Sequence, residues 1–123
     1  MKQASLIRSF RQSDFDAFAA LSGDDNAIHT DPDFAARTRF GKTVAHGAML
    51  CAVLRGLVDQ LVPGGRQLRQ STMYPAPSPV DEVLRFQAEI TAEDENRVVI
   101  DLLVQRVADG ETTCTGQTEI ARG

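Results

Sequence analysis

The chain has 123 residues, of which 42% are hydrophobic and 24% charged, a balance that excludes a disordered tail. Its formal net charge is −4 and its thirteen Lys and Arg are scattered, which argues against nucleic-acid binding because that needs a clustered basic face. The longest apolar run, Ala48 to Leu54, is too short for the roughly 20 residues of a membrane-spanning helix, so we expect one cytoplasmic domain over 1–123.

The first half of the chain predicts one strand followed by helices. Residues 4–10 favour a short strand, and Ser13 with Asp16 resembles a capping box that would begin a helix ending at Ser22-Gly23. A second helix start is predicted at 30–33, where a cap residue, a proline and an acidic residue follow one another. From Val44 to Val62 the pattern predicts a long helix that is apolar on nearly all sides for three turns, so other elements must wrap it.

The second half predicts antiparallel strands. A strand is expected over about 67–74, and apolar residues alternate with polar ones over 84–90, 98–104 and, more weakly, 112–120. Turns are predicted at 93–96 and at Asp109-Gly110. The fold class is therefore α+β, with one buried helix against a curled antiparallel sheet. Such a sheet has an open edge, and pairing with a second copy, a homodimer, would cover it.

The octapeptide SGDDNAIH, residues 22–29, is the first candidate site. On one continuous helix Asp24 and His29 would lie about 140° apart, so they converge only if the backbone between them turns. Gly23 and Asn26 tolerate such a turn, and Asn26 can brace it. A carboxylate and an imidazole at one point can hold a water and move its protons. The alternative is an ordinary polar loop, since Asp, Asn and Gly are common in Asx-turns.

The second candidate is the segment FGKTVAHGAML, residues 40–50. Gly47 would lie in the first turn of the long helix, where backbone N–H groups have no partner within the helix. Its exposed amide and the helix dipole favour a developing oxyanion. We interpret the neighbouring His46 as a structural hydrogen-bonding residue. Cys51 and Cys114 lack metal-ligand spacing and are interpreted as small buried side chains.

Residues 22–50 closely resemble the signature of the MaoC-like dehydratases and R-specific enoyl-CoA hydratases, S-G-D-x-N-P-x-H followed by F-G and a-H-G-M. The segment MYPAPSPVDEV, residues 73–83, is more weakly similar to the later family motif F-x-x-P-V-x-P-G-D-x-L. This resemblance implies a hot-dog fold, a homodimer and reversible hydration of a trans-2-enoyl-CoA to the (R)-3-hydroxyacyl-CoA.

The resemblance also implies roles for individual residues. Asp24 and His29 would be the catalytic pair that activates water, and the Gly47 amide would stabilise the enolate-like thioester oxygen. Ser22, Gly23 and Asn26 would support the loop. No metal or other cofactor is implied, because addition of water to a conjugated thioester needs only acid/base groups and an oxyanion site.

Three positions depart from the family pattern. Ala27 replaces the usual proline of the first motif, which loosens the turn. Val80 replaces a glycine before Asp81, and Arg55 stands in the long helix where related hydratases carry a small or hydroxyl residue. Arg55 either extends to solvent or meets a polar substrate.

Two alternatives to this function stay open at this point. The same chemistry could act on an acyl-carrier-protein thioester or on a branched or carboxylated acyl group. A different class is a non-catalytic thioester-binding module of the same fold, although such a module would need neither Asp24 nor His29. A thioesterase is disfavoured because the loop has the hydratase pattern.

Overall fold

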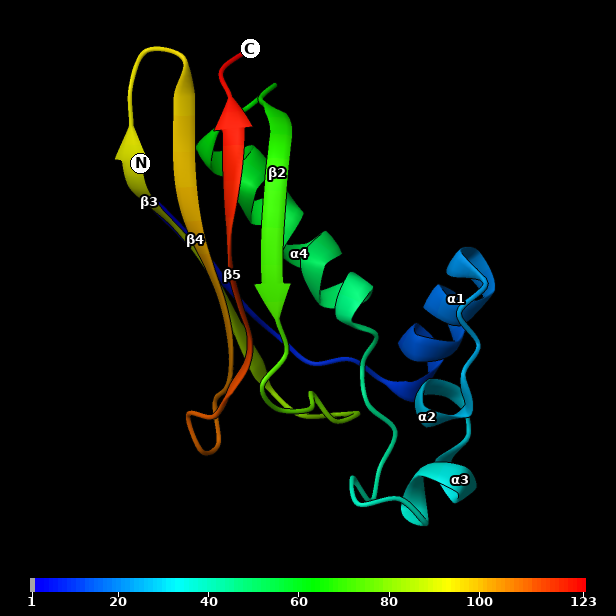
Figure 1. Cartoon of the computed structure of the whole chain (residues 1–123). Helices are drawn as coiled ribbons and strands as arrows, with labels where there is room; N and C mark the ends of the chain where they lie inside the picture. The colour runs from blue at the N-terminus through cyan, green and yellow to red at the C-terminus, as the bar shows by residue number, and fades with distance from the viewer. Residues whose placement is uncertain (1) are drawn as a thin grey trace.

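Five strands form one antiparallel sheet, and the longest helix lies along one face of it (Figure 1). The structure is a computed structural model that describes residues 2–123. In chain order its elements are β1 (Gln3–Arg8), α1 (Gln12–Ser22), α2 (Ala27–Thr30), α3 (Pro32–Ala36), α4 (Gly47–Leu61), β2 (Arg66–Met73), β3 (Leu84–Glu93), β4 (Arg97–Arg106) and β5 (Thr112–Ala121). The strand order is β1-β3-β4-β5-β2, which confirms the predicted α+β class.

The core lies between the sheet and α4. Alternate residues of β3 and β4 are buried, as their two-residue period predicts. They pack with the inner side of α4 and with β5 in one apolar cluster that includes Leu50, Leu54, Leu57, Val58, Leu84, Phe86, Ala88, Val98, Ile100, Leu102, Val104, Cys114 and Ile120. Cys114 is a buried side chain, as predicted, and burial raises the pKa of its thiol to about 12. Cys51 is only partly buried, which differs from the prediction.

The long helix begins three residues later than predicted. Val44 forms a β-bridge with Pro79, and the Ala45 N–H donates to the Ser78 carbonyl at 2.9 Å. These contacts hold the chain extended until His46, the N-cap residue. The helix is also not wrapped on all sides in the described chain, because its outer side, formed by Ala48, Ala52 and Gly56, is exposed.

The helices α1, α2 and α3 form a separate arm beyond the end of the sheet (Figure 1). The predicted cap of α1 was wrong: Arg11 is the N-cap residue, and its N–H donates to the Asp14 carboxylate at 2.8 Å. The cap of α3 matches the prediction, since Asp31 accepts hydrogen bonds from two backbone N–H groups and Pro32 follows it. This arm carries the Asp24–His29 segment.

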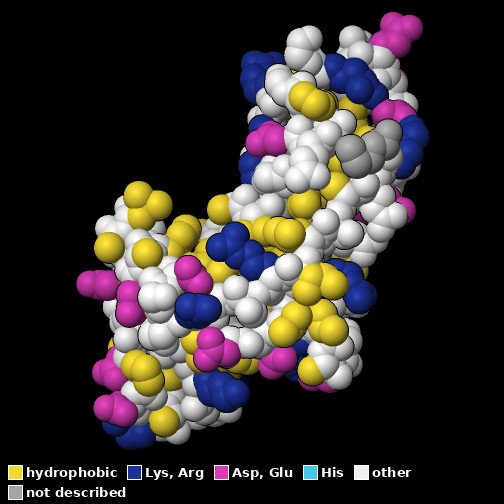
Figure 2. Space-filling model, turned by 180° about the vertical axis from the view of Figure 1, so that it is seen from behind, with side chains coloured by type: hydrophobic (Ala, Val, Ile, Leu, Met, Phe, Trp, Pro, Cys, Tyr) yellow, Lys and Arg dark blue, Asp and Glu magenta, His cyan; other side chains and the backbone are white. Residues whose placement is uncertain are grey.

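A groove of about 460 Å³ lies between β1, α1 and α4. It is lined mainly by apolar side chains, including Leu6, Phe10, Phe18 and Val53. Figure 2 shows hydrophobic side chains gathered in the corner between the arm formed by α1–α3 and the body formed by the sheet and α4. None of the helices within residues 2–123 has the length and hydropathy to cross a membrane.

The strand β2 is held against β5 by a close backbone approach at Gly116, and this contact predicts a stability effect. A Cβ at Gly116 would lie 2.1 Å from the Ser71 carbonyl oxygen of β2, so Gly116→Ala must separate the two strands locally. We expect a loss of about 1–3 kcal/mol in the free energy of unfolding, measured by urea denaturation.

Gly56→Ala is the matched control for this prediction. Apart from its chain neighbours and the backbone of its own helix, no heavy atom of residues 2–123 lies within 4 Å of a Cβ built there, and the residue is in the middle of α4. This variant is expected to gain about 0.5–1 kcal/mol from helix propensity. Equal stability of the two variants would contradict the close approach of β2 and β5.

Candidate active site

The segment between Asp24 and His29 turns sharply, as their convergence requires. The helix α1 ends at Ser22, and Gly23 follows in the left-handed conformation with φ 81°. The Ser22 hydroxyl accepts a hydrogen bond from the Asp24 N–H at 3.1 Å. Asn26 then caps α2, its side-chain oxygen accepting the Ile28 N–H at 3.1 Å. The short helix α2 carries His29 back toward Asp24.

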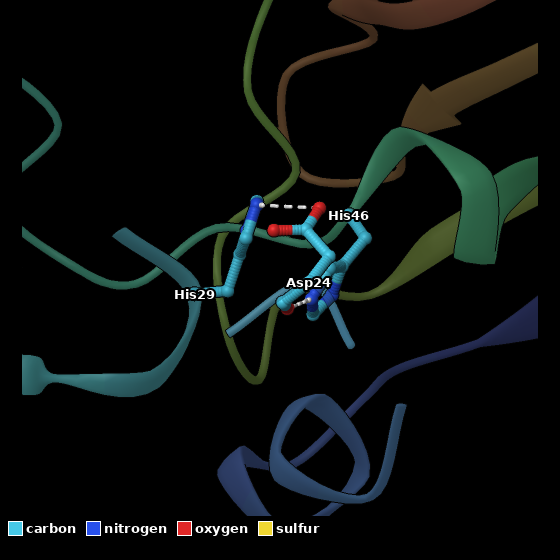
Figure 3. Close-up of side chains that lie close together, drawn as sticks. All are labelled: Asp24, His29 and His46. Carbon is cyan, nitrogen blue, oxygen red and sulfur yellow. Dashed lines mark hydrogen bonds and ion pairs between the residues drawn. The ribbon is translucent and has the colours of Figure 1, made fainter. Parts of the chain in front are cut away.

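The Asp24 carboxylate and the His29 imidazole face one another (Figure 3). His29 Nε2 and Asp24 Oδ2 are 3.9 Å apart, which is too far for a direct hydrogen bond. At that separation a water oxygen can lie about 2.8 Å from both atoms. The exposed fraction of the side chain is 14% for His29 and 55% for Asp24, so the pair lies at an opening that a small molecule can reach.

The tautomer of His29 follows from its other nitrogen. His29 Nδ1 lies 2.8 Å from the Val44 carbonyl oxygen, which can only accept a hydrogen bond. In the neutral ring Nδ1 therefore carries the proton, and Nε2 presents its lone pair toward Asp24. This is the arrangement of a general base that is oriented by a main-chain carbonyl.

His46 holds Asp24 in position through its main chain. Its Nε2 donates to the Asp24 main-chain carbonyl at 2.8 Å, and its ring stacks on the His29 ring with centroids 3.9 Å apart (Figure 3). The ring is only 1% exposed and also contacts Phe18. These contacts agree with the prediction that His46 is a structural hydrogen-bonding residue.

The three side chains of Asp24, His29 and His46 have possible metal-ligand atoms within 4.8 Å of one another. Their geometry nevertheless suits acid/base chemistry better than a metal ion. His46 Nε2 donates to the Asp24 carbonyl, and the remaining nitrogen of that ring, Nδ1, is buried. The rings are stacked with 22° between their planes, and lone pairs in nearly parallel planes do not converge on one ion.

Gly47 is the first residue of α4 and directly follows His46. Among residues 2–123 its backbone N–H has no hydrogen-bond acceptor, as is usual for the first turn of a helix. A Cβ at this position would lie 2.6 Å from Tyr74 Cζ, so only glycine leaves room for the tyrosine ring. The structure therefore places a free amide at the positive end of a 15-residue helix, directly after His46, which contacts both Asp24 and His29.

Two residues that the sequence did not indicate support His29. Gln12 Nε2 donates to the His29 carbonyl at 2.8 Å, and the Thr43 hydroxyl donates to Gln12 Oε1 at 2.6 Å. Thr43 directly precedes Val44, whose carbonyl orients the His29 ring. Gln12 thus connects the two segments that determine the position of the imidazole. Isolated Gln and Thr residues carry no recognisable motif, so only the fold reveals this link.

The three departures from the family pattern have visible structural consequences. Ala27 begins α2 without a proline because the Asn26 cap sets the turn. Asp81, after Val80, adopts φ 65°, and its N–H donates to the Phe10 carbonyl at 2.7 Å. Arg55 forms an ion pair with Asp59 and donates to the Gly65 carbonyl at 3.2 Å, at the C-terminal part of α4.

Comparison with known proteins shows similarity along nearly the whole chain. Residues 3–112 match the model of the MaoC-like domain family. The chain is 34% identical to an (R)-specific enoyl-CoA hydratase of Aeromonas caviae over 111 residues, covering 89% of this chain and 83% of the relative. It is 28% identical to a mitochondrial 3-hydroxyacyl-[acyl-carrier-protein] dehydratase of Arabidopsis thaliana, covering 86% of this chain and 70% of that one.

A solved structure of the (R)-hydratase from A. caviae that takes part in PHA biosynthesis superimposes with a TM-score of 0.93. The identity in this alignment is 30%, and it covers 99% of this chain and 95% of that one. The agreement confirms the predicted hot-dog fold. On the family match and this identity, the chain belongs to the MaoC-like dehydratase family.

Proposed function

We propose that the protein catalyses the reversible hydration of a trans-2-enoyl-CoA to the (R)-3-hydroxyacyl-CoA. The observation that carries the proposal is the pairing of the Asp24 carboxylate with His29 Nε2 at 3.9 Å, held by His46, the residue directly before the free amide of Gly47. The similarity to (R)-specific enoyl-CoA hydratases supports this chemistry and its stereochemistry.

In the proposed mechanism Asp24 and His29 hold one water molecule between them. Both groups accept hydrogen bonds, so the two protons of the water point at them and a lone pair of its oxygen points at the substrate. As the oxygen bonds to Cβ, one of the pair takes a proton from the water. The electrons of the Cα–Cβ double bond move toward the thioester oxygen.

The Gly47 amide stabilises the negative charge that develops on that oxygen. Its N–H is oriented before the reaction starts, and the dipole of α4 adds to its attraction for an anion. The proton that the pair took from the water is then delivered to Cα, which restores the thioester carbonyl, completes the addition and returns both groups to their starting state. Dehydration follows the same steps in reverse. Every step uses only protein groups and water, so we propose that no cofactor takes part.

We also propose a homodimer as the working form. The strand β2 is at the edge of the sheet, and Leu68 and Met73 on it are exposed to 39% and 68%. An unpaired edge with exposed apolar side chains favours pairing with a second copy. Residues 1–123 would form one domain of each subunit, and a cytoplasmic location stays a prediction.

The proposed function is tested with a panel of trans-2-enoyl thioesters on CoA and on acyl-carrier protein. Loss of the enoyl absorbance is followed, and the product is separated on a chiral column. We expect the (R)-alcohol from the CoA series. Faster turnover of the carrier-protein series would favour the acyl-carrier-protein alternative, to which the similarity with the Arabidopsis dehydratase points. No turnover in either series would reject hydration and favour a binding module.

Gln12 is predicted to act as a positioning residue for His29. Gln12→Ala removes both its hydrogen bond to the His29 carbonyl and its contact with Thr43. Because small displacements of a catalytic group reduce turnover strongly, we expect kcat to fall about 10-fold while KM changes little. Gln117→Ala, on the exposed side of β5, is the matched control and should keep normal kinetics. Unchanged kcat in Gln12→Ala would show that this link does not position His29.

A further inference from the structure

A cavity of about 320 Å³ adjoins the start of α4. Its walls are mostly apolar, and they include Phe40, Val44, Gly47, Leu50 and Tyr74. It touches the candidate active site at two places, since Gly47 supplies the free amide and Val44 accepts the hydrogen bond from His29. A thioester whose oxygen lies at the Gly47 amide would have this cavity next to its acyl group.

Tyr74 closes one side of this cavity. It is the first residue after β2, and its ring lies directly against the α-carbon of Gly47: a Cβ there would be 2.6 Å from Tyr74 Cζ and 2.9 Å from its hydroxyl oxygen. The three heavy atoms nearest to that Cβ position all belong to Tyr74. The space beside the proposed oxyanion site therefore ends at the tyrosine ring.

A chain of polar side chains holds the ring in place. The Tyr74 hydroxyl lies 3.2 Å from Cys51 Sγ, which is one helical turn beyond Gly47. Gln70 Nε2 donates to the same sulfur at 3.3 Å, and Gln67 Nε2 contacts both Gln70 Oε1 at 2.5 Å and the Thr118 hydroxyl at 2.9 Å. These residues occupy the space between α4 and β2 behind the ring.

This polar chain has a consequence for an acyl group. Gln67 and Gln70 are exposed and Tyr74 is 48% exposed, so an alkyl chain that passed the ring would leave the apolar cavity for a hydrated polar surface and lose the free energy of its burial. Burial also raises the pKa of Tyr74 to about 12, so its hydroxyl keeps its proton and its contact with Cys51 at neutral pH. The closed side is thus both a steric and a polar barrier.

From this arrangement we propose that Tyr74 is a specificity-determining residue that limits the length of the acyl chain. The inference rests on the proposed function and adds a substrate class to it: short-chain enoyl thioesters. Longer acyl groups would collide with the ring before their thioester oxygen reached the Gly47 amide. The polar chain from Cys51 to Thr118 would be the second barrier.

The test compares kcat/KM for trans-2-enoyl-CoA substrates of four, six, eight and ten carbons. The natural protein is expected to prefer four or six carbons. Tyr74→Ala should raise the eight- to four-carbon ratio of kcat/KM by at least about 10-fold, because a pocket discriminates by about that factor for each added methylene. Tyr74→Phe keeps the ring and should keep the natural preference.

Two further variants make the outcome decisive. Ile7→Ala changes an exposed apolar side chain on β1, at the opposite edge of the sheet from β2, and should leave the chain-length profile unaltered. Tyr74→Leu gives an intermediate shift and replaces Tyr74→Ala if circular dichroism shows that the alanine variant is unfolded. A profile that stays the same in both Tyr74→Ala and Tyr74→Leu, or a natural protein that uses four and ten carbons equally well, would overturn the inference.

The same experiment separates this inference from the proposed function. Hydration by the natural protein with no change of profile in the Tyr74 variants would reject the role of Tyr74 and keep the hydratase. Failure of the natural protein to hydrate any of the four substrates would reject the proposed function, and the inference with it.

Discussion

His29→Ala is expected to lower kcat/KM for enoyl-CoA hydration by a factor on the order of 100 or more. The substitution removes the Nε2 lone pair that faces Asp24 across 3.9 Å. General acid–base catalysis by one positioned side chain contributes about this much. The loss should appear mainly in kcat, because the Gly47 amide and the adjoining cavity are retained.

Asp24→Asn tests the other half of the pair. The amide has nearly the same shape as the carboxylate but cannot accept a proton in the same way, so a similar loss is expected with normal folding. The Asp24 main-chain carbonyl, which accepts from His46, is unaffected by the change. Circular dichroism and thermal unfolding check the fold of both variants. Near-normal turnover in either one would disprove the proposed mechanism.

The second large effect is expected from Gly47→Ala. The new methyl group would lie 2.6 Å from Tyr74 Cζ, so the ring must move into the adjoining space or the start of α4 must shift. Either change disturbs the approach of a thioester oxygen to the Gly47 amide. Losing one donor of this kind costs about 10² to 10³ in kcat, and we expect a loss on the order of 10² in a steady-state assay.

A double variant identifies the cause of that loss. In Gly47→Ala with Tyr74→Ala the collision is removed, and the backbone amide is still present. If crowding by the ring is the cause, the double variant recovers at least about 10-fold relative to Gly47→Ala. If it stays as slow as Gly47→Ala, the methyl group itself blocks the thioester, and Tyr74 has no part in the effect.

Most of the fold could be predicted from the residues. The two-residue period of β3 and β4 and the apolar residues of α4 determine one layer of strands against one helix. Element ends were less predictable, since they depend on contacts far away in the chain. Val44 continues the apolar pattern of α4, but its bridge to Pro79 keeps it extended.

The helix caps were likewise only partly predictable from the sequence. Asp31 was predictable as the cap of α3 because its side chain bonds to the two N–H groups that directly follow Pro32. At α1 the expected Ser13 cap was wrong. Asp14 instead accepts the N–H of Arg11, and arginine is not among the residues that favour a cap position.

The catalytic loop was predictable as a set of residues but not as a geometry. Gly23 and Asn26 indicated a turn, and the turn forms. The sequence could not show that His29 donates to the Val44 carbonyl, which determines the tautomer, or that Gln12 connects His29 with Thr43. These contacts join residues 15 to 31 positions apart, and no local pattern encodes them.

The most direct test of the central claim is the loss of absorbance of crotonyl-CoA on addition of the purified protein, measured beside His29→Ala at equal concentration. We predict rapid loss with the natural protein, formation of (R)-3-hydroxybutyryl-CoA, and a rate lower by a factor on the order of 100 with the variant. An equal rate in the two proteins, or formation of the (S)-alcohol, would contradict hydration by the Asp24–His29 pair.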